Sequence, residues 1–217
     1  MPETRPNNIR PVLPALTASA GMVLFAVCSH RGLPWILVGV AGLLLTTAAI
    51  APALRSTAQS LALIGLAKFS RRTVVFAAVG CAVGAGFGMG HRHSLGLPLL
   101  PAGGVELFGV VACLIGATEE LVFRGWLQGS LRARGWPVAV VAAALAHAAY
   151  KAGLFAWPTA PNTPDCLALG LWTAAAGIIP GLLREFSGSV VPAMAAHVAF
   201  DFVVYGAVAH APWWVWT

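Results

Sequence analysis

Long uninterrupted apolar stretches, each about as long as a bilayer is thick, constrain this chain more than any other feature. A helix of roughly 18–22 residues crosses a hydrocarbon core about 30 Å thick, and the sequence offers several such stretches between short polar breaks. Only 9% of the 217 residues are charged while 59% are hydrophobic, so a soluble protein of this size would lack a polar surface. Because backbone groups need partners inside a bilayer, and the stretches do not alternate as strands do, the sequence predicts helices. The predicted fold class is all-α, a multi-pass transmembrane helical bundle.

About seven membrane spans are predicted from the lengths of these stretches. They cover residues 12–30, 33–54, 73–90, a stretch that begins near 103, 136–155, 166–183 and 189–210. The segment 57–69 is ambiguous, because its thirteen residues would extend only about 20 Å as a helix. We expect this segment to be interfacial or re-entrant, and an eighth span results if it crosses the membrane.

Basic residues at the ends of the apolar stretches set the expected orientation. With the N-terminus in the cytoplasm, nine of them face that side and three face the opposite side, as the positive-inside rule requires. The nine are Arg5, Arg10, Arg55, Lys68, Arg71, Arg72, Arg132, Arg134 and Arg184, and the three are Arg31, Arg92 and Lys151. This scattered placement does not fit nucleic-acid binding, despite the net charge of +6. Short loops without an appended soluble domain favour a bacterial inner (plasma) membrane.

Small residues are predicted to serve helix packing. Gly80, Gly84 and Gly88 recur every four residues and therefore share one helix face, which allows a second helix to approach closely. The four cysteines lie in or beside apolar stretches and form no CxxC pair, so we expect neither a disulfide framework nor a zinc framework built from them.

Ionisable residues inside membrane spans are costly and therefore mark candidate functional sites. Glu119, Glu120 and Arg124 lie near the middle of a continuous apolar helix expected over about 103–131. Glu120 and Arg124 are four residues apart on one face, so we expect them to form a structural ion pair. Glu119 lies about 100° around the helix and points elsewhere, which leaves its carboxylate available for chemistry.

Two histidines in later spans are predicted to lie in a similar layer of the membrane to Glu119. His147 lies in the stretch 136–155, and His197 is followed four residues later by Asp201, which can orient its imidazole or accept its proton. Measured along the helices from one predicted membrane face, Glu119, His147 and His197 lie roughly 20, 16 and 12 Å deep. A carboxylate and two imidazoles in one layer can activate a water molecule directly or through a metal.

These residues resemble the motifs of the CAAX prenyl protease and bacteriocin-processing family of intramembrane endopeptidases. The string EELVFRGWLQGSL at 119–131 is similar to the first motif, two glutamates followed after three residues by arginine. His147 matches the histidine of the second motif, and His197 with Asp201 matches the third. The resemblance covers about 105–210, so we divide the chain into N-terminal membrane helices without motifs (1–100) and a catalytic membrane core (101–217).

Two positions depart from the family pattern. Ala143 stands where the family usually has phenylalanine, which affects packing beside His147 more than its chemistry. Asp201 stands where asparagine is more frequent, and an ionised aspartate cannot donate a hydrogen bond to a developing oxyanion. A protonated Asp201, or its pairing with a protonated His197, would preserve a donor.

The resemblance implies an intramembrane endopeptidase, of glutamic or metal-dependent type, that cleaves a membrane-associated protein or peptide substrate. Glu119 would be the general base for water, His147 would help hold that water, and His197 with Asp201 would stabilise the oxyanion. Glu120 and Arg124 would brace the site. No cofactor is favoured, although Glu119, His147 and His197 could instead be three zinc ligands. They come from separate helices without the HExxH spacing, which favours the glutamic mechanism.

Two other classes of function remain open at this point. A non-catalytic immunity or scaffold protein could share the same fold. A proton-coupled transporter also places carboxylates and histidines near the midplane. No repeat relates the two halves of the chain and the motif residues all lie in the second half, which counts against transport.

Overall fold

Every regular element that the structure describes is a helix, as the sequence predicts. The computed structural model describes residues 12–29, 57–67, 69–155 and 165–209. Within these ranges, α4 (Arg71–Ser94), α7 (Trp136–Phe155) and α8 (Cys166–Ser187) are long and apolar enough to cross a membrane. The chain is an all-α, multi-pass membrane protein.

The remaining helices match most of the expected spans. They are α1 (Val12–Ser29), α3 (Thr57–Ile64), α5 (Leu107–Glu120), α6 (Gln128–Leu131), α9 (Val191–Tyr205), the π-helix η1 (Leu121–Leu127) and the 3-10 turn η2 (Arg132–Arg134). The expected span at 33–54 lies outside the described residues. The helix expected from about 103 begins at Leu107, and it is not uniform, because a π-helical segment joins α5 to α6.

The ambiguous segment 57–69 contains only a short helix. The eight residues of α3 extend about 12 Å, too little to cross a bilayer. The turn after α3 joins the start of α9, because the Val190 backbone N–H donates to the Gly65 carbonyl at 3.1 Å. The interfacial or re-entrant position of the segment 57–69 stays a prediction.

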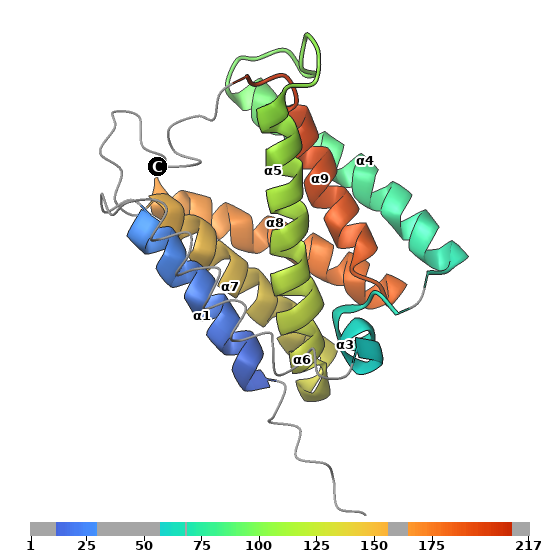
Figure 1. Ribbon diagram of the computed structural model, residues 1–217. Helices are drawn as coiled ribbons and strands as arrows, with labels where there is room; N and C mark the ends of the chain where they lie inside the picture. The colour runs from blue at the N-terminus through green and yellow to red at the C-terminus, as the bar shows by residue number, and fades with distance from the viewer. Residues whose placement is uncertain (1–11, 30–56, 68, 156–164, 210–217) are drawn as a thin grey trace, which may run out of the picture.

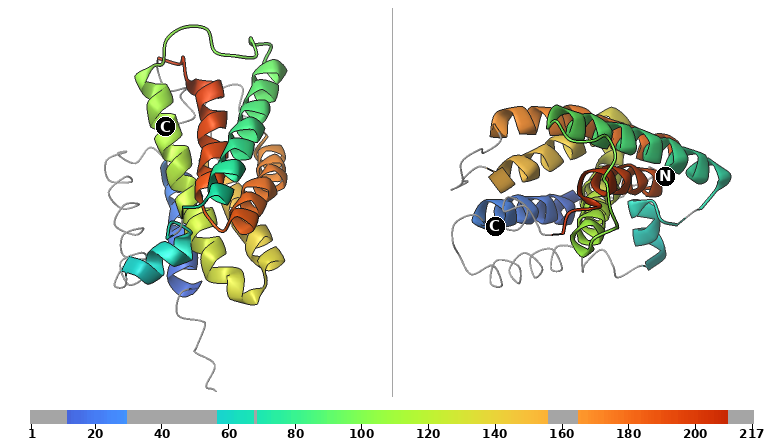
Figure 2. Two further views of the ribbon diagram at one scale, coloured as in Figure 1. Left: turned by 90° about the vertical axis from the view of Figure 1, so that its right-hand side faces the viewer. Right: turned by 90° about the horizontal axis from the view of Figure 1, so that it is seen from above.

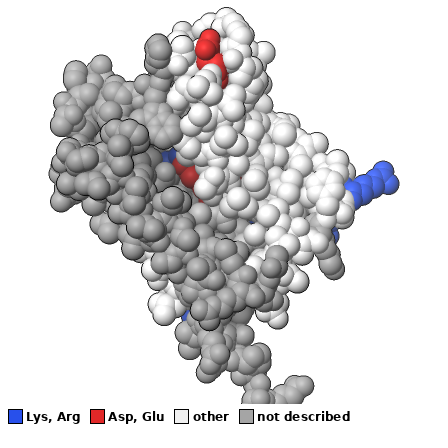
Figure 3. Space-filling view, in the orientation of Figure 1, with Lys and Arg blue, Asp and Glu red and all other residues white. Residues whose placement is uncertain are grey.

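Helix α5 runs through the middle of the bundle (Figure 1). Helices α1 and α7 lie side by side on one side of it, α9 and α4 lie together on the other, and α8 packs against α7 and α9 (Figures 1 and 2). The described part of the face in Figure 3 is almost free of charged side chains, as expected for a surface in contact with lipid. Because α1 and α4 pack directly on helices that carry motifs, residues 1–100 contribute to the support of the core, and the proposed domain boundary stays a prediction.

The glycine stripe of α4 packs against α9, which confirms its predicted role. Gly80, Gly84 and Gly88 are all buried. A methyl group on Gly80 would overlap the carbonyl oxygen of Pro192, and one on Gly84 would overlap that of Ala196. The two helices approach so closely only because these positions lack a side chain.

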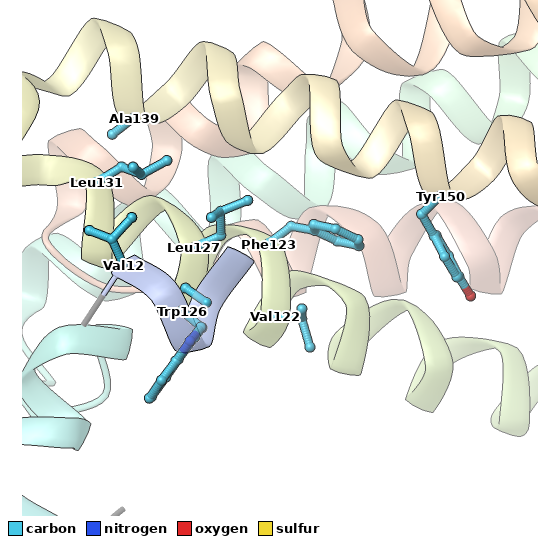
Figure 4. Packing of buried hydrophobic residues seen from close by; sticks show 9 residues of the cluster. Val12, Val122, Phe123, Trp126, Leu127, Leu131, Ala139 and Tyr150 are labelled. Carbon is cyan, nitrogen blue, oxygen red and sulfur yellow. The ribbon is translucent and has the colours of Figure 1, made fainter. Parts of the chain in front are cut away.

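Apolar side chains anchor η1 between α1 and α7 (Figure 4). Phe123, Trp126 and Leu127 of η1 are buried together with Val12 of α1 and Ala139 of α7. This packing sets the position of the helix that carries the first motif. Burial of such large side chains contributes roughly 1.5–3 kcal/mol each relative to exposure in water, but much less where the alternative is lipid.

A tight turn between α8 and α9 precedes the third motif. Helix α8 ends at Ser187, and the next residue, Gly188, adopts a left-handed conformation with φ of 74° that glycine accepts without steric cost. The next helix starts three residues later at Val191 and has a proline in its first turn. His197 therefore lies in the second turn of α9, where this helix packs on α5.

Candidate active site

The predicted site residues converge from three helices. Glu119 lies at the end of α5, His147 on α7 and His197 on α9, and one ligand atom from each lies within 4.8 Å of the others. Glu119 and His147 are buried, and only 12% of the His197 side chain is exposed. The three residues thus share one depth in the bundle, as the distances along their helices predict.

The two adjacent glutamates point to different partners. Glu120 Oε1 accepts from Arg124 Nη1 at 3.0 Å, which confirms the predicted ion pair, and it lies 2.9 Å from His197 Nδ1. Glu119 Oε2 lies 2.9 Å from His147 Nε2. Glu119 Oε1 accepts from Lys151 Nζ at 2.8 Å. Glu119 is therefore separate from the Glu120–Arg124 pair, as predicted, but a lysine holds one of its oxygens.

Lys151 was missed as a site residue because the charge count treated it as a loop charge. It lies within α7, inside the predicted span 136–155 and four residues after His147, so both side chains leave the helix on one face. The same correction applies to Arg92 and Arg184, which lie in α4 and α8 and are 8% and 1% exposed. Without these three, the sequence count becomes eight basic residues against one, and the orientation stays a prediction.

Arg124 determines how the ring of His147 is used. Its Nη1 also contacts His147 Nδ1, and arginine can only donate hydrogen bonds. Nδ1 must therefore be the acceptor, which places the ring proton on Nε2, facing Glu119. Phe123 of η1 stacks on the His147 ring with centroids 4.9 Å apart. Phe123, a residue of the first motif, thus helps hold the His147 ring in place. The family's usual phenylalanine at position 143 is replaced here by a buried alanine.

The π-helix is a feature of the site that sequence periodicity did not reveal. Segments of π-helix inside α-helices occur frequently at functional sites. Here η1 begins directly after Glu120 and includes Arg124. Arg184 of α8 donates from Nε to the Arg124 carbonyl at 2.7 Å and from Nη2 to the Leu63 carbonyl at 2.7 Å. The buried guanidinium of Arg184 thereby ties η1 to α3.

His197 lies among three carboxylates. Its Nδ1 faces Glu120, while its Nε2 lies 3.7 Å from Glu119 Oε2 and 3.8 Å from Asp201 Oδ2. The distance to Asp201 is too long for a hydrogen bond. Glu120, and not Asp201 as the four-residue spacing suggests, therefore makes the hydrogen bond that orients the imidazole. Asp201 is buried beside Gly116, where an added methyl group would overlap its Oδ2.

A pocket of about 220 Å³ opens beside Glu119. Side chains of α1, α5 and α7 line it, and all but three of them are aliphatic: Met22, Val111, Leu114, Ile115, Thr118, Glu119 and Tyr150. An apolar pocket with one carboxylate at its wall can accept an apolar chain and present a reactive group to it. In Figure 3 a small group of acidic and basic atoms is visible where the described surface meets the residues drawn in grey, and other charged atoms of the described face lie near its top and at its right edge.

The three converging residues fit a zinc ion only in part. Two histidines and a glutamate are a known set of catalytic zinc ligands. A histidine that binds zinc normally donates its other N–H to an acceptor. His197 Nδ1 meets this condition at Glu120, but His147 Nδ1 faces the Arg124 guanidinium, which is a donor. If His147 bound zinc through Nε2, its ring proton would lie on Nδ1 and would face the Arg124 guanidinium, which is also a donor. His147 therefore does not fit a zinc ligand in this arrangement.

Comparison with known proteins supports the resemblance drawn from the motifs. Residues 101–203 match the model of a family described as type II CAAX prenyl endopeptidase Rce1-like. The matched segment includes all three motifs and confirms the predicted family resemblance. No curated protein and no solved structure matches the chain.

Proposed function

From the match of residues 101–203 to the Rce1-like endopeptidases, we propose that this protein is an intramembrane endopeptidase of the glutamic type. The observation that carries the proposal is the buried Glu119 carboxylate, held by His147 and lying 3.7 Å from His197 at the wall of an apolar pocket. A peptide bond of a membrane-associated protein or peptide is the proposed substrate.

In the proposed reaction Glu119 is the general base. A water molecule beside its carboxylate gives up a proton to it as the water oxygen bonds to the carbonyl carbon of the scissile peptide. The carbonyl π electrons move to oxygen, which becomes an oxyanion. The tetrahedral intermediate then collapses, the C–N bond breaks and the proton held by Glu119 passes to the leaving nitrogen. The water is added across the bond, and Glu119 is regenerated as a carboxylate.

His147 and His197 have different tasks in this mechanism. His147 donates from Nε2 to Glu119 and keeps the carboxylate aimed at the water, because Arg124 holds the opposite ring nitrogen. His197 presents Nε2 toward the centre of the site and would donate to the oxyanion in its protonated form, with Asp201 beside it. Glu120 and Arg124 brace both histidines without touching the substrate.

A metal-dependent peptidase built on Glu119, His147 and His197 is the alternative mechanism. The donor conflict at His147 and the lysine on Glu119 both argue against it. A zinc enzyme should contain about one equivalent of zinc and lose activity reversibly in chelator. We expect a metal-free preparation to retain its full rate in chelator.

The proposal is tested by Glu119→Gln in proteoliposomes that contain the purified protein and fluorogenic lipid-anchored peptides. We expect loss of cleavage by at least about 100-fold, because glutamine keeps the shape of the side chain and removes the base. Unchanged detergent extraction and a single cooperative thermal unfolding transition would show that the variant is folded. Cleavage by Glu119→Gln at the wild-type rate would refute the proposal and favour a scaffold or transport function.

A further inference from the structure

We infer that Lys151 is the counter-charge and positioning residue of Glu119, an inference that rests on the proposed role of Glu119 as the base. No family motif includes this lysine, and nothing in the spacing of the motif residues requires it. The inference follows from the contacts, the burial and the charges around the Glu119 carboxylate.

Lys151 and His147 hold the two oxygens of one carboxylate from one helix. His147 lies 2.9 Å from Oε2 and Lys151 lies 2.8 Å from Oε1. The two donors are four residues apart on α7, so the helix itself sets the spacing between them. Two contacts on separate oxygens restrict rotation of the carboxylate more than the contact with His147 alone would.

Among the residues that the structure describes, Lys151 is the cation that balances the charge of Glu119. The side chain of Glu119 is 1% exposed, and an ionised carboxylate so far from water requires an opposite charge close by. Arg124, a second cation in the centre, forms its ion pair with Glu120. His147 accepts from Arg124 at Nδ1 and is therefore neutral when it donates from Nε2. His197 lies 3.7 Å from Glu119 and makes its short contact with Glu120.

The ammonium group reaches Glu119 from the open side of the site. The Lys151 side chain is 26% exposed, and its Nζ lies 5.5 Å from the ring centroid of Tyr150. Tyr150 and Glu119 both line the apolar pocket. Lys151 thus stays partly exposed while it neutralises a carboxylate that is almost completely buried.

A double-mutant cycle on thermal unfolding tests the counter-charge without any assay of cleavage. Lys151→Met leaves the Glu119 carboxylate uncompensated, and we expect it to lower Tm by about 10 °C. Glu119→Gln leaves only a partly exposed lysine and should lower Tm less. In the double variant the destabilising charge is gone, so Tm should return to within about 3 °C of Glu119→Gln alone. Arg134→Met, which removes an exposed positive charge in η2, is the control and should leave Tm unchanged.

Additive losses in the double variant would overturn the inference, even if the protein proves to be an active protease. Should Lys151→Met fail to fold, recovery of folded protein in Glu119→Gln/Lys151→Met would support the inference, and continued failure would overturn it.

Chemical rescue tests the positioning role. In a background without the native cysteines, we expect Lys151→Cys to lower kcat by about 100-fold with little change in KM, because the base is misplaced. Alkylation with 2-bromoethylamine rebuilds an ammonium group at this position and should restore kcat to within about tenfold. Iodoacetamide adds a neutral group and should not. Equal recovery with both reagents would overturn the role of the charge, whereas an inactive wild-type protein would count against the proposed function alone.

Discussion

Helix α9 has two faces that are held in opposite ways. One face carries Pro192 and Ala196, and Gly80 and Gly84 of α4 pack directly against their backbone. The other face carries His197, which meets the glutamates of α5 through polar contacts. The first contact is disrupted when an atom is added, and the second when a charge is removed. A single helix can therefore combine close packing in lipid with a buried polar site.

The polar face should be the more sensitive of the two. Glu120→Gln removes the charge that balances the fully buried Arg124 and weakens the acceptor for His197. Loss of one partner of a buried ion pair costs about 3–5 kcal/mol, so we expect this variant to show the largest fall in the free energy of unfolding. Denaturant titration in detergent micelles measures it. A loss no greater than that of Glu119→Gln would contradict the bracing role of Glu120.

The packing face should respond to a single methyl group. Gly84→Ala places a methyl group against the Ala196 carbonyl, so α4 and α9 must separate. We expect a loss of about 1–3 kcal/mol, typical of overpacking. Gly86→Ala is the matched control, because a methyl group there meets nothing within 4 Å, and it should be neutral or slightly stabilising. Similar unfolding curves for the two variants would contradict the close approach of the helices.

Asp201→Asn should have the smallest effect. The Asp201 carboxylate makes no short hydrogen bond to His197, since their closest charged atoms are 3.8 Å apart. Asparagine is also the commoner residue in the resembling family and can donate to an oxyanion. We expect kcat/KM to stay within about threefold of wild type, less than the effect of one typical hydrogen bond. Gly116→Ala, which crowds Asp201 and His197, should reduce kcat/KM more, and the reverse order would show that the charge of Asp201 is essential.

Local periodicity determined much of the fold and part of the site. The apolar stretch 136–155 predicted the bounds of α7. Four-residue spacings predicted the close contact of the α4 glycine stripe with another helix and the Glu120–Arg124 ion pair. The helical rise predicted that Glu119, His147 and His197 lie at one depth. All of these follow from the sequence because the face and depth of a helical residue depend only on its position along the helix.

Tertiary contacts alone decided which group each buried side chain binds. Lys151, Arg92 and Arg184 look alike in the sequence, as basic residues near the ends of apolar stretches. In the structure one binds a carboxylate of the site and the other two bind backbone carbonyls. The π-helical segment and the contact of Arg124 with His147 also depend on neighbours distant in the sequence. A long basic side chain can reach several partners, so only the crossing of the helices determines which of them lies within hydrogen-bonding distance.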